Sequence, residues 1–277
     1  MSQMETISGE TESQPILPPE IEREIFEITA QFPGNAVNLV LVARRTQIWI
    51  ERLIYDTVIL SDEEICNKFM RTLDSRPPQF FADNVRSLCV PGDVGALCTM
   101  RVLKACQGVV NLAIWLDKPQ DTPLFPFISS LRPTRLSVNM HGLYGSGCKP
   151  DFKHPFFSNI THLELVDWLT WAAYIGSLSP HLTHLAVDFD LHLQDSETRL
   201  RDVLASCQSL VVCIALVSDD ESMIVVANGL AGIEDPRLVI LSESNVIENW
   251  ESSLQRTDAS LWSFAEDIVA AKTAKSS

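Results

Sequence analysis

A short apolar phrase recurs along this chain. It has the form Φ-x-x-Φ-x-Φ, in which Φ is usually apolar. The eight copies begin at Tyr55, Val85, Val109, Pro133, Ile160, Leu182, Leu210 and Pro236. Their central residues are separated by 30, 24, 24, 27, 22, 28 and 26 positions and are Val58, Leu88, Leu112, Leu136, Leu163, Leu185, Cys213 and Val239. Residues two apart on a strand share a face, so each phrase predicts a short strand with one apolar face.

Stretches with helical periodicity lie between these phrases. The clearest apolar stripe has the spacing i, i+3, i+4, i+7 and consists of Leu200, Val203, Leu204 and Cys207. Ser61-x-x-Glu64 predicts a capping box at the start of another helix. Strands that alternate with helices predict a parallel sheet with right-handed crossovers. The spacing is the leucine-rich-repeat period, so we expect an α/β repeat whose parallel sheet curves, with helices on its outer side.

Three short helices are predicted before the first repeat. Pro18 and Pro19 suit a first helical turn, and the first helix continues through an apolar stripe to a stop at Pro33-Gly34. Asn35 is expected to cap a second helix, AVNLVLVARR, and a third helix is expected near residues 46–54. A core of about 45 residues is marginal by itself, so this module is expected to need a docked neighbour.

The sequence pattern of the last 33 residues predicts helices. Asp258 is expected to cap a helix whose one side carries Leu261, Ala265, Ile268 and Lys272, and this helix is predicted to be a lid over the last repeat. The predicted division is therefore a disordered tail (1–15), a helical module (16–56), a repeat region (57–244) and a C-terminal helical cap (245–277).

The charge of the chain argues against two classes of partner. Asp and Glu outnumber Lys and Arg 36 to 21, and residues 188–267 hold 16 acids and 4 bases. Such a surface repels phosphate groups, so nucleic acids and anionic membranes are not expected partners. A basic partner is compatible with this charge, as is a merely solvated surface.

The cysteines and the N-terminus bear on localisation. The seven Cys form no CxxC pair, and several occupy apolar positions of the repeat, where a thiol packs as a small hydrophobic group. The first residues are polar and acidic, unlike a signal peptide, and no apolar run approaches the length of a membrane span. We therefore expect a reducing compartment, either the cytoplasm or the nucleus.

The segment LPPEIEREIFEITAQFPGNAVNLVLVARRTQIWIERLIYDTVIL (17–60) resembles the F-box-like motif. Its Leu-Pro opening, Glu-Ile and Ile-Phe pairs, and a second helix leading into Val-x-Arg-Arg carry the resemblance. The remainder, through WESSLQRTDASLWSFAEDIVAAK, is similar to the leucine-rich-repeat-like domains attached to such motifs in mushroom-forming fungi. The resemblance implies a substrate-recognition adaptor of a Skp–cullin–F-box ubiquitin ligase. The module would dock on the Skp adaptor protein, and the repeats would hold a substrate protein.

The same resemblance implies a set of docking residues, namely Leu17, Pro18, Ile21, Ile25, Leu39, Val42 and Trp49. One position departs from the motif, which places a Trp four residues after the Val. Here that position is Thr46, and Trp49 lies seven residues after Val42. An alternative is therefore a repeat scaffold whose degenerate F-box does not dock the ligase.

Residues for catalysis, cofactors or metals are not apparent in the sequence. The Gly-rich stretch 141–151 matches neither GxGxxG nor a P-loop nor a nucleophile elbow, so a hydrolase or transferase, the third hypothesis, lacks a motif. His162 and His184 occupy the same slot of successive repeats, where they can stack, and they are expected to be surface residues rather than metal ligands. Side chains just past strand ends are the predicted substrate contacts, and these are Trp115, Asp117, Asp167, Trp168, Asp188 and Asp190.

Overall fold

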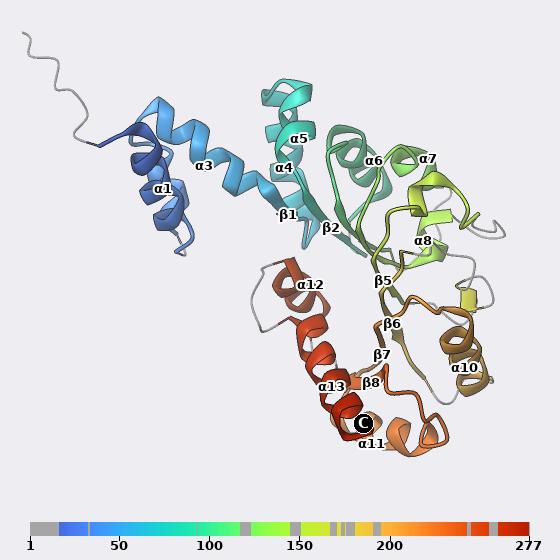
Figure 1. The fold of residues 1–277 in the computed structure, drawn as a ribbon. Helices are drawn as coiled ribbons and strands as arrows, with labels where there is room; N and C mark the ends of the chain where they lie inside the picture. The colour runs from blue at the N-terminus through green and yellow to red at the C-terminus, as the bar shows by residue number, and fades with distance from the viewer. Residues whose placement is uncertain are drawn as a thin grey trace, which may run out of the picture. The chain divides into compact units, whose positions relative to one another are not determined.

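The computed structural model describes residues 17–32, 34–92, 94–116, 123–144, 151–166, 171–172, 175, 181–190, 195–242, 245–254 and 260–276 (Figure 1). The chain forms two compact units that divide between Tyr55 and Asp56. Asp117, Asp167 and Trp168 of the predicted site lie outside the described residues.

The first unit contains α1 (Pro19–Ala30), α2 (Asn35–Leu39) and nearly all of α3 (Arg44–Asp56). Pro19 occupies the first turn of α1, as expected, and Gly34 begins α2 with a positive φ of 81°. Two expectations were wrong. The cap of α2 is Gly34 rather than Asn35, whose side chain instead donates to the Thr29 carbonyl. The second helix also ends at Leu39 and does not continue to Arg45.

The second unit is built on one eight-stranded parallel sheet in which strand order follows the sequence. Its strands are β1 (Thr57–Ile59), β2 (Ser87–Pro91), β3 (Asn111–Trp115), β4 (Arg135–Val138), β5 (His162–Leu165), β6 (His184–Asp188), β7 (Val212–Val217) and β8 (Leu238–Ser242). The predicted α/β class and parallel sheet are confirmed.

The central residues of the first seven phrases form one continuous row across the sheet. Each is the register partner of the next, from Val58 through Leu88 and onward to Cys213. The eighth phrase was placed wrongly, because Cys213 pairs with Leu238 and not with Val239. A shift of one residue reverses the face of every side chain on a strand. Val239 and Leu241 therefore lie on the opposite face, where they join a cluster with Trp262.

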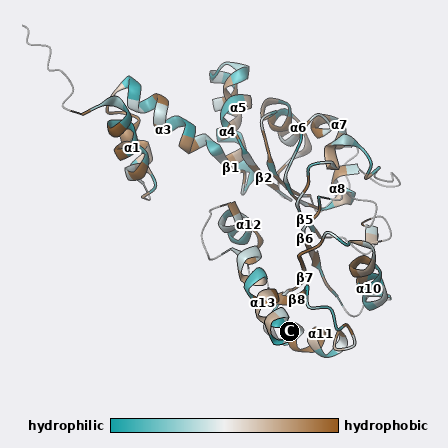
Figure 2. Ribbon diagram, in the orientation of Figure 1, coloured by the Kyte–Doolittle hydropathy of each residue, from teal (hydrophilic) through white to brown (hydrophobic). Residues whose placement is uncertain are grey.

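Helices cover the face of the sheet to which this apolar row belongs (Figure 1). They are α4 (Glu63–Ser75), α5 (Pro78–Asn84), α6 (Ala96–Ala105), α7 (Phe125–Ile128), α8 (Met140–Tyr144), the short 3₁₀ helix η1 (Pro155–Phe157), α10 (Ser196–Ser206) and α11 (Asp220–Gly229). Figure 2 shows both apolar and polar residues on these helices, as amphipathic helices have. The predicted stripe on α10 is buried at Leu200, Val203 and Leu204.

One predicted helix cap in this layer was misplaced, and one glycine in it is required by a close backbone contact. The N-cap of α4 is Asp62, whose Oδ1 accepts a hydrogen bond of 2.8 Å from the Ile65 amide, so the predicted Ser61–Glu64 box was one residue early. Gly108 follows α6, and a Cβ there would meet the Ala82 carbonyl oxygen at 2.0 Å. Only glycine permits this approach between the two helix–strand units.

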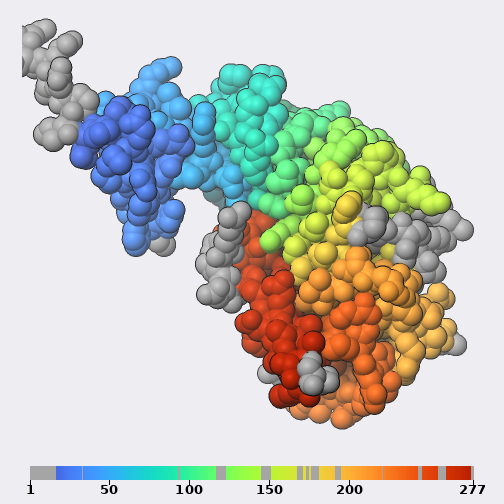
Figure 3. Space-filling view, in the orientation of Figure 1, coloured from blue at the N-terminus to red at the C-terminus, as the bar shows by residue number. Residues whose placement is uncertain are grey.

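The C-terminal helices α12 (Val246–Leu254) and α13 (Leu261–Ser276) lie on the other face of the sheet (Figure 1). Trp250 of α12 packs against Cys89, Ala113 and Trp115 of β2 and β3. Trp262 and Ala265 of α13 pack against residues of β6, β7 and β8, and Figure 3 shows these helices in red against the last repeats in orange. The predicted C-terminal helical cap thus packs on a face of the sheet, with α13 over the last strands. We call α12 and α13 the C-terminal strap, and the face they cover the strap face.

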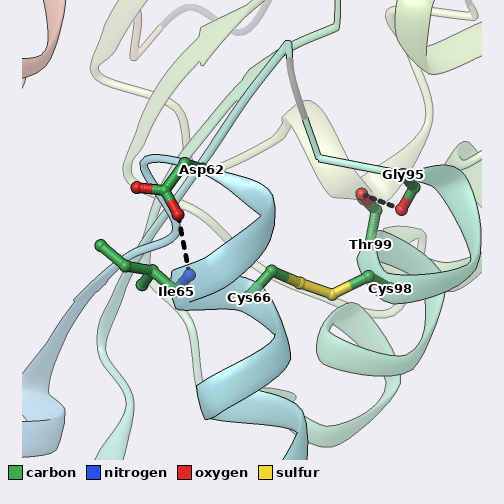
Figure 4. Close-up of a disulfide and its surroundings, with 6 residues drawn as sticks. All are labelled: Asp62, Ile65, Cys66, Gly95, Cys98 and Thr99. Carbon is green, nitrogen blue, oxygen red and sulfur yellow. Dashed lines mark hydrogen bonds between the residues drawn. A yellow bond between two sulfur atoms is a disulfide. The ribbon is translucent and has the colours of Figure 1, made fainter.

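Cysteines pack as the sequence predicts, with one exception. Among the described residues Cys89, Cys106, Cys207 and Cys213 are buried thiols, and burial raises the pKa of Cys89 to about 12. Cys66 of α4 and Cys98 of α6 are joined by a disulfide (Figure 4). Nothing in the spacing predicted this bond, because its partners are 32 residues apart on different helices.

Candidate functional site: an acidic cleft and an exposed apolar module

An acidic cleft lies where β6 and β7 end. Its volume is about 900 Å³, and it is lined by Asp188, Phe189, Asp190, Val217, Ser218, Asp219, Glu221, Ser222, Val225 and Val226. Two predicted substrate contacts, Asp188 and Asp190, are thus brought together. Asp188 is the last residue of β6 and Asp190 lies two residues beyond it, and the carboxyl ends of adjacent parallel strands meet at one edge of a sheet.

The floor of the cleft is apolar and fixed by neighbouring elements. Phe189, Val217 and Val226 are buried, and the Phe189 amide donates to the Leu216 carbonyl at 2.8 Å, which joins the end of β6 to β7. Val225 on α11 remains 55% exposed. Val225 is therefore the exposed apolar side chain among the residues that line the cleft, beside its carboxylates.

Four carboxyl groups belong to this cleft, and no Lys or Arg occurs among the described residues that line it. Burial, and secondarily the nearby Asp190, raise the pKa of Asp188. Hydrogen bonds from the Ser222 amide (2.7 Å) and from the Ser218 and Ser222 hydroxyls lower the pKa of Asp219, which caps α11. The carboxylate of Asp219 is therefore a fixed negative charge at neutral pH. The charged form of Asp188 is disfavoured by burial, and a nearby cation would stabilise it.

Sequence reasoning missed Asp219 and Glu221, together with the whole of α11. The available signal was the run SDDES directly after β7, in which an Asp precedes a helix in the N-cap position. It was not recognised because Ile224, Val225 and Val226 are consecutive and form no helical stripe.

Trp115 is not part of this cleft. It is 9% exposed, its indole Nε1 donates to Ser137 Oγ at 2.6 Å, and Trp250 of the C-terminal strap packs on the same cluster. The prediction of Trp115 as a surface contact does not hold while α12 covers it.

The first unit presents a second candidate surface, which is apolar. Within the described residues of α1 and α2 none is buried, and α3 buries only Thr46 and Ile50. Large apolar side chains are instead exposed, and they are Leu17, Ile21, Ile25, Ile28, Phe32, Val37, Leu41, Val42, Ile48, Leu53 and Ile54.

Most of the docking residues that the resemblance implies belong to this surface. Leu17, Pro18, Ile21, Ile25 and Val42 are exposed, and Leu39 is half-buried. Trp49 is half-buried and packs on Phe26 with ring centroids 6.4 Å apart. Thr46, at the position where the motif has Trp, is buried, and its hydroxyl lies 3.1 Å from the Leu39 carbonyl and 2.7 Å from the Ala43 carbonyl.

The described part of the chain holds no group of three or more His, Cys, Asp or Glu side chains placed to bind a metal ion. None of its helices combines the length and apolarity needed to cross a bilayer. No protein-family model matches the sequence, and no curated protein is significantly similar to it.

Proposed function

We propose that this chain is a substrate-recognition adaptor of a Skp–cullin–F-box type ubiquitin ligase, with no catalytic role of its own. Its first unit docks on the Skp adaptor, and its leucine-rich-repeat-like sheet carries the substrate. The observation that carries the proposal is the exposed apolar surface of the first unit. The sequential order and register of the eight strands support a repeat architecture beside it.

The exposed surface favours docking over a purely structural role for these residues. A stable helical module normally buries one apolar stripe per helix. Here Ile21, Ile25 and Ile28 form such a stripe on α1, yet they are 45, 48 and 52% exposed. Val42, which as core of the module would be buried, is 61% exposed. Contiguous apolar surface of this kind is typical of a protein interaction site.

The acidic cleft is the proposed substrate site. Its carboxylates favour a cationic ligand, and the exposed Val225 in its lining favours an adjacent apolar side chain. The substrate class is therefore a peptide segment in which Arg or Lys alternates with apolar residues.

Co-expression with a Skp adaptor protein tests the docking part. We expect a complex of one adaptor and one chain that survives size-exclusion chromatography, with its mass measured by light scattering. A folded, monomeric chain that elutes separately from the adaptor would contradict the proposal.

Peptide binding tests the substrate part. Fluorescence anisotropy of a labelled peptide of alternating Arg and Leu should show binding that weakens with added salt. Replacement of both Asp188 and Asp190 by Asn should weaken binding at least tenfold, because about 0.7 kcal/mol per lost charge contact already gives this factor.

The matched control for this change is Asp202→Asn with Glu248→Gln. It removes the same net charge from exposed residues that do not line the cleft. Equal weakening by the two double substitutions would show that peptide affinity depends only on the net charge of the chain. The cleft would then not be the binding site.

The alternative is a repeat scaffold that does not dock on the ligase. Thr46 and Trp49 favour it, because the third helix directs Trp49 onto Phe26 and places a small buried residue where the motif has its Trp. The co-expression experiment separates the two functions, since a scaffold would leave the adaptor unbound and still bind the basic peptide.

A further inference from the structure

A row of polar residues crosses the strap face at the beginning of three adjacent strands. Arg135 of β4 is the register partner of His162 of β5, and His162 is the register partner of His184 of β6. The C-terminal strap contacts each end of this row. The Arg135 guanidinium donates to the Ser253 carbonyl in the last turn of α12, where a helix presents partial negative charge.

The two imidazoles are stacked beneath α13. Their centroids are 4.1 Å apart and their planes differ by 4°, so the rings stack. The expectation of surface histidines was wrong for His184, which is 7% exposed. The Trp262 indole meets both rings edge-on, at 5.3 Å from His162 and 5.6 Å from His184. Glu266, one helical turn further along α13, places Oε1 2.9 Å from His184 Nε2.

Threonine hydroxyls orient both rings from the other side. Thr161 Oγ1 lies 2.9 Å from His162 Nδ1, and Thr183 Oγ1 lies 2.8 Å from His184 Nδ1. Each hydroxyl also reaches the backbone carbonyl of the preceding repeat. A hydroxyl has one proton and can accept as well as donate, so it can serve the ring in either protonation state.

The surroundings of the two imidazoles disfavour their protonated, charged form, most strongly at His162. Burial, then His184 and then Arg135 lower the pKa of His162 to about 3. Burial also lowers the pKa of His184, although Glu266 acts in the opposite direction. The charged groups that face the pair are Arg135 on β4 and Glu266 on α13, and Glu164 lies two residues along β5 on the same face.

We propose that the C-terminal strap is an acid-released cover, in which protonation of the stacked His162–His184 pair detaches α13 from the strap face. A cation on either ring lies 4.1 Å from the other ring and close to Arg135, in a site partly withdrawn from water beside the Trp262 indole. Detachment returns both imidazoles to water and exposes the sheet face that the strap covers.

The direction of the pH dependence follows from the two states. An imidazole in water has a pKa near 6.5, and the covered His162 has a pKa of about 3. The open state therefore binds more protons below pH 6.5, so the cover is complete above that pH and is weakened as the pH falls. His162 alone shifts the equilibrium about tenfold between pH 7.5 and 5.5.

Hydrogen exchange of the full chain, followed by mass spectrometry and corrected for intrinsic rates, tests the proposal. We expect protection of residues 261–276 to fall about tenfold from pH 7.5 to pH 5.5, while the amides of β3 (Asn111–Trp115) keep their protection. Unchanged protection of α13, or an equal fall in β3, would overturn it.

Two substitutions identify the sensor. His162→Phe keeps an aromatic ring in the stack and removes its titration, so the fall should shrink to less than about threefold. Glu266→Gln removes the carboxylate at His184 and should loosen α13 already at pH 7.5. Asp267→Asn is the control, because it removes one charge from the next exposed position of the same helix. Equal behaviour of the Glu266 and Asp267 variants would contradict the proposed role of the pair, even if His162→Phe does not fold.

Discussion

Leu17→Asp combined with Ile21→Asp is expected to abolish the complex with the Skp adaptor while leaving the chain folded. Both side chains are nearly half exposed, at 44 and 45%, so their replacement changes little inside the chain. At an interface the same carboxylates would be buried without partners, at a cost of about 2 kcal/mol or more each. A loss of at least about 100-fold in affinity follows.

Titration calorimetry with the adaptor measures this loss, and circular dichroism verifies the fold. The matched control is Leu97→Asp with Val211→Asp, which places two carboxylates at exposed apolar positions of the second unit (71 and 48% exposed). This control should bind as the unchanged chain does. Normal binding by the Leu17 and Ile21 variant would remove α1 from the docking surface.

A chain that begins at residue 61 is expected to aggregate, whereas one that begins at residue 56 should fold. The shorter chain lacks β1, whose Val58 is 8% exposed and which is followed by the fully buried Leu60. Loss of their burial costs about 1.5–3 kcal/mol each. It also leaves β2 as an unpaired edge strand, in which the Cys89 carbonyl has lost the hydrogen bond from the Leu60 amide.

The two truncations differ by only five residues, so the comparison isolates the edge strand from the helices of the first unit. Size-exclusion chromatography and thermal unfolding of both chains provide the measurement. Two monomeric chains with the same melting temperature would show that β1 does not protect the sheet.

The sheet was predictable because the same apolar phrase recurs at similar spacing and marks one equivalent position in each of the first seven strands. From Val58 to Cys213 one apolar row fixes the register. In β8 residues 238–241 are all apolar, so the phrase can be aligned with its centre at either Leu238 or Val239. Either face could then be assigned to the core, and the pairing with β7 alone decides it.

The position of the C-terminal strap was not predictable from its amphipathic pattern. A helix with one apolar side fits equally well over the end or over a face of a sheet. The strap face gives no apolar signal at the start of β4, β5 and β6, where its residues are Arg135, His162 and His184. The strap also explains why the prediction for Trp115 failed. Trp115 lies at the end of a strand, where side chains are often exposed, but α12 covers it.

The acidic cleft was predictable in part. Asp188 and Asp190 follow a recognised strand, so their place at the edge of the sheet could be derived from the sequence. Asp219, Glu221 and the apolar floor depend on how α11 returns against β7 and β8, which no local pattern specifies.

The exposed apolar surface of the first unit is the basis of the proposed adaptor function, and hydrogen exchange with and without the Skp adaptor tests it most directly. The amides of α1 and α2, within residues 19–39, should gain protection at least tenfold on binding, while those of α10 remain unchanged. Unaltered exchange of α1 and α2 at a saturating concentration of adaptor would contradict docking through this surface.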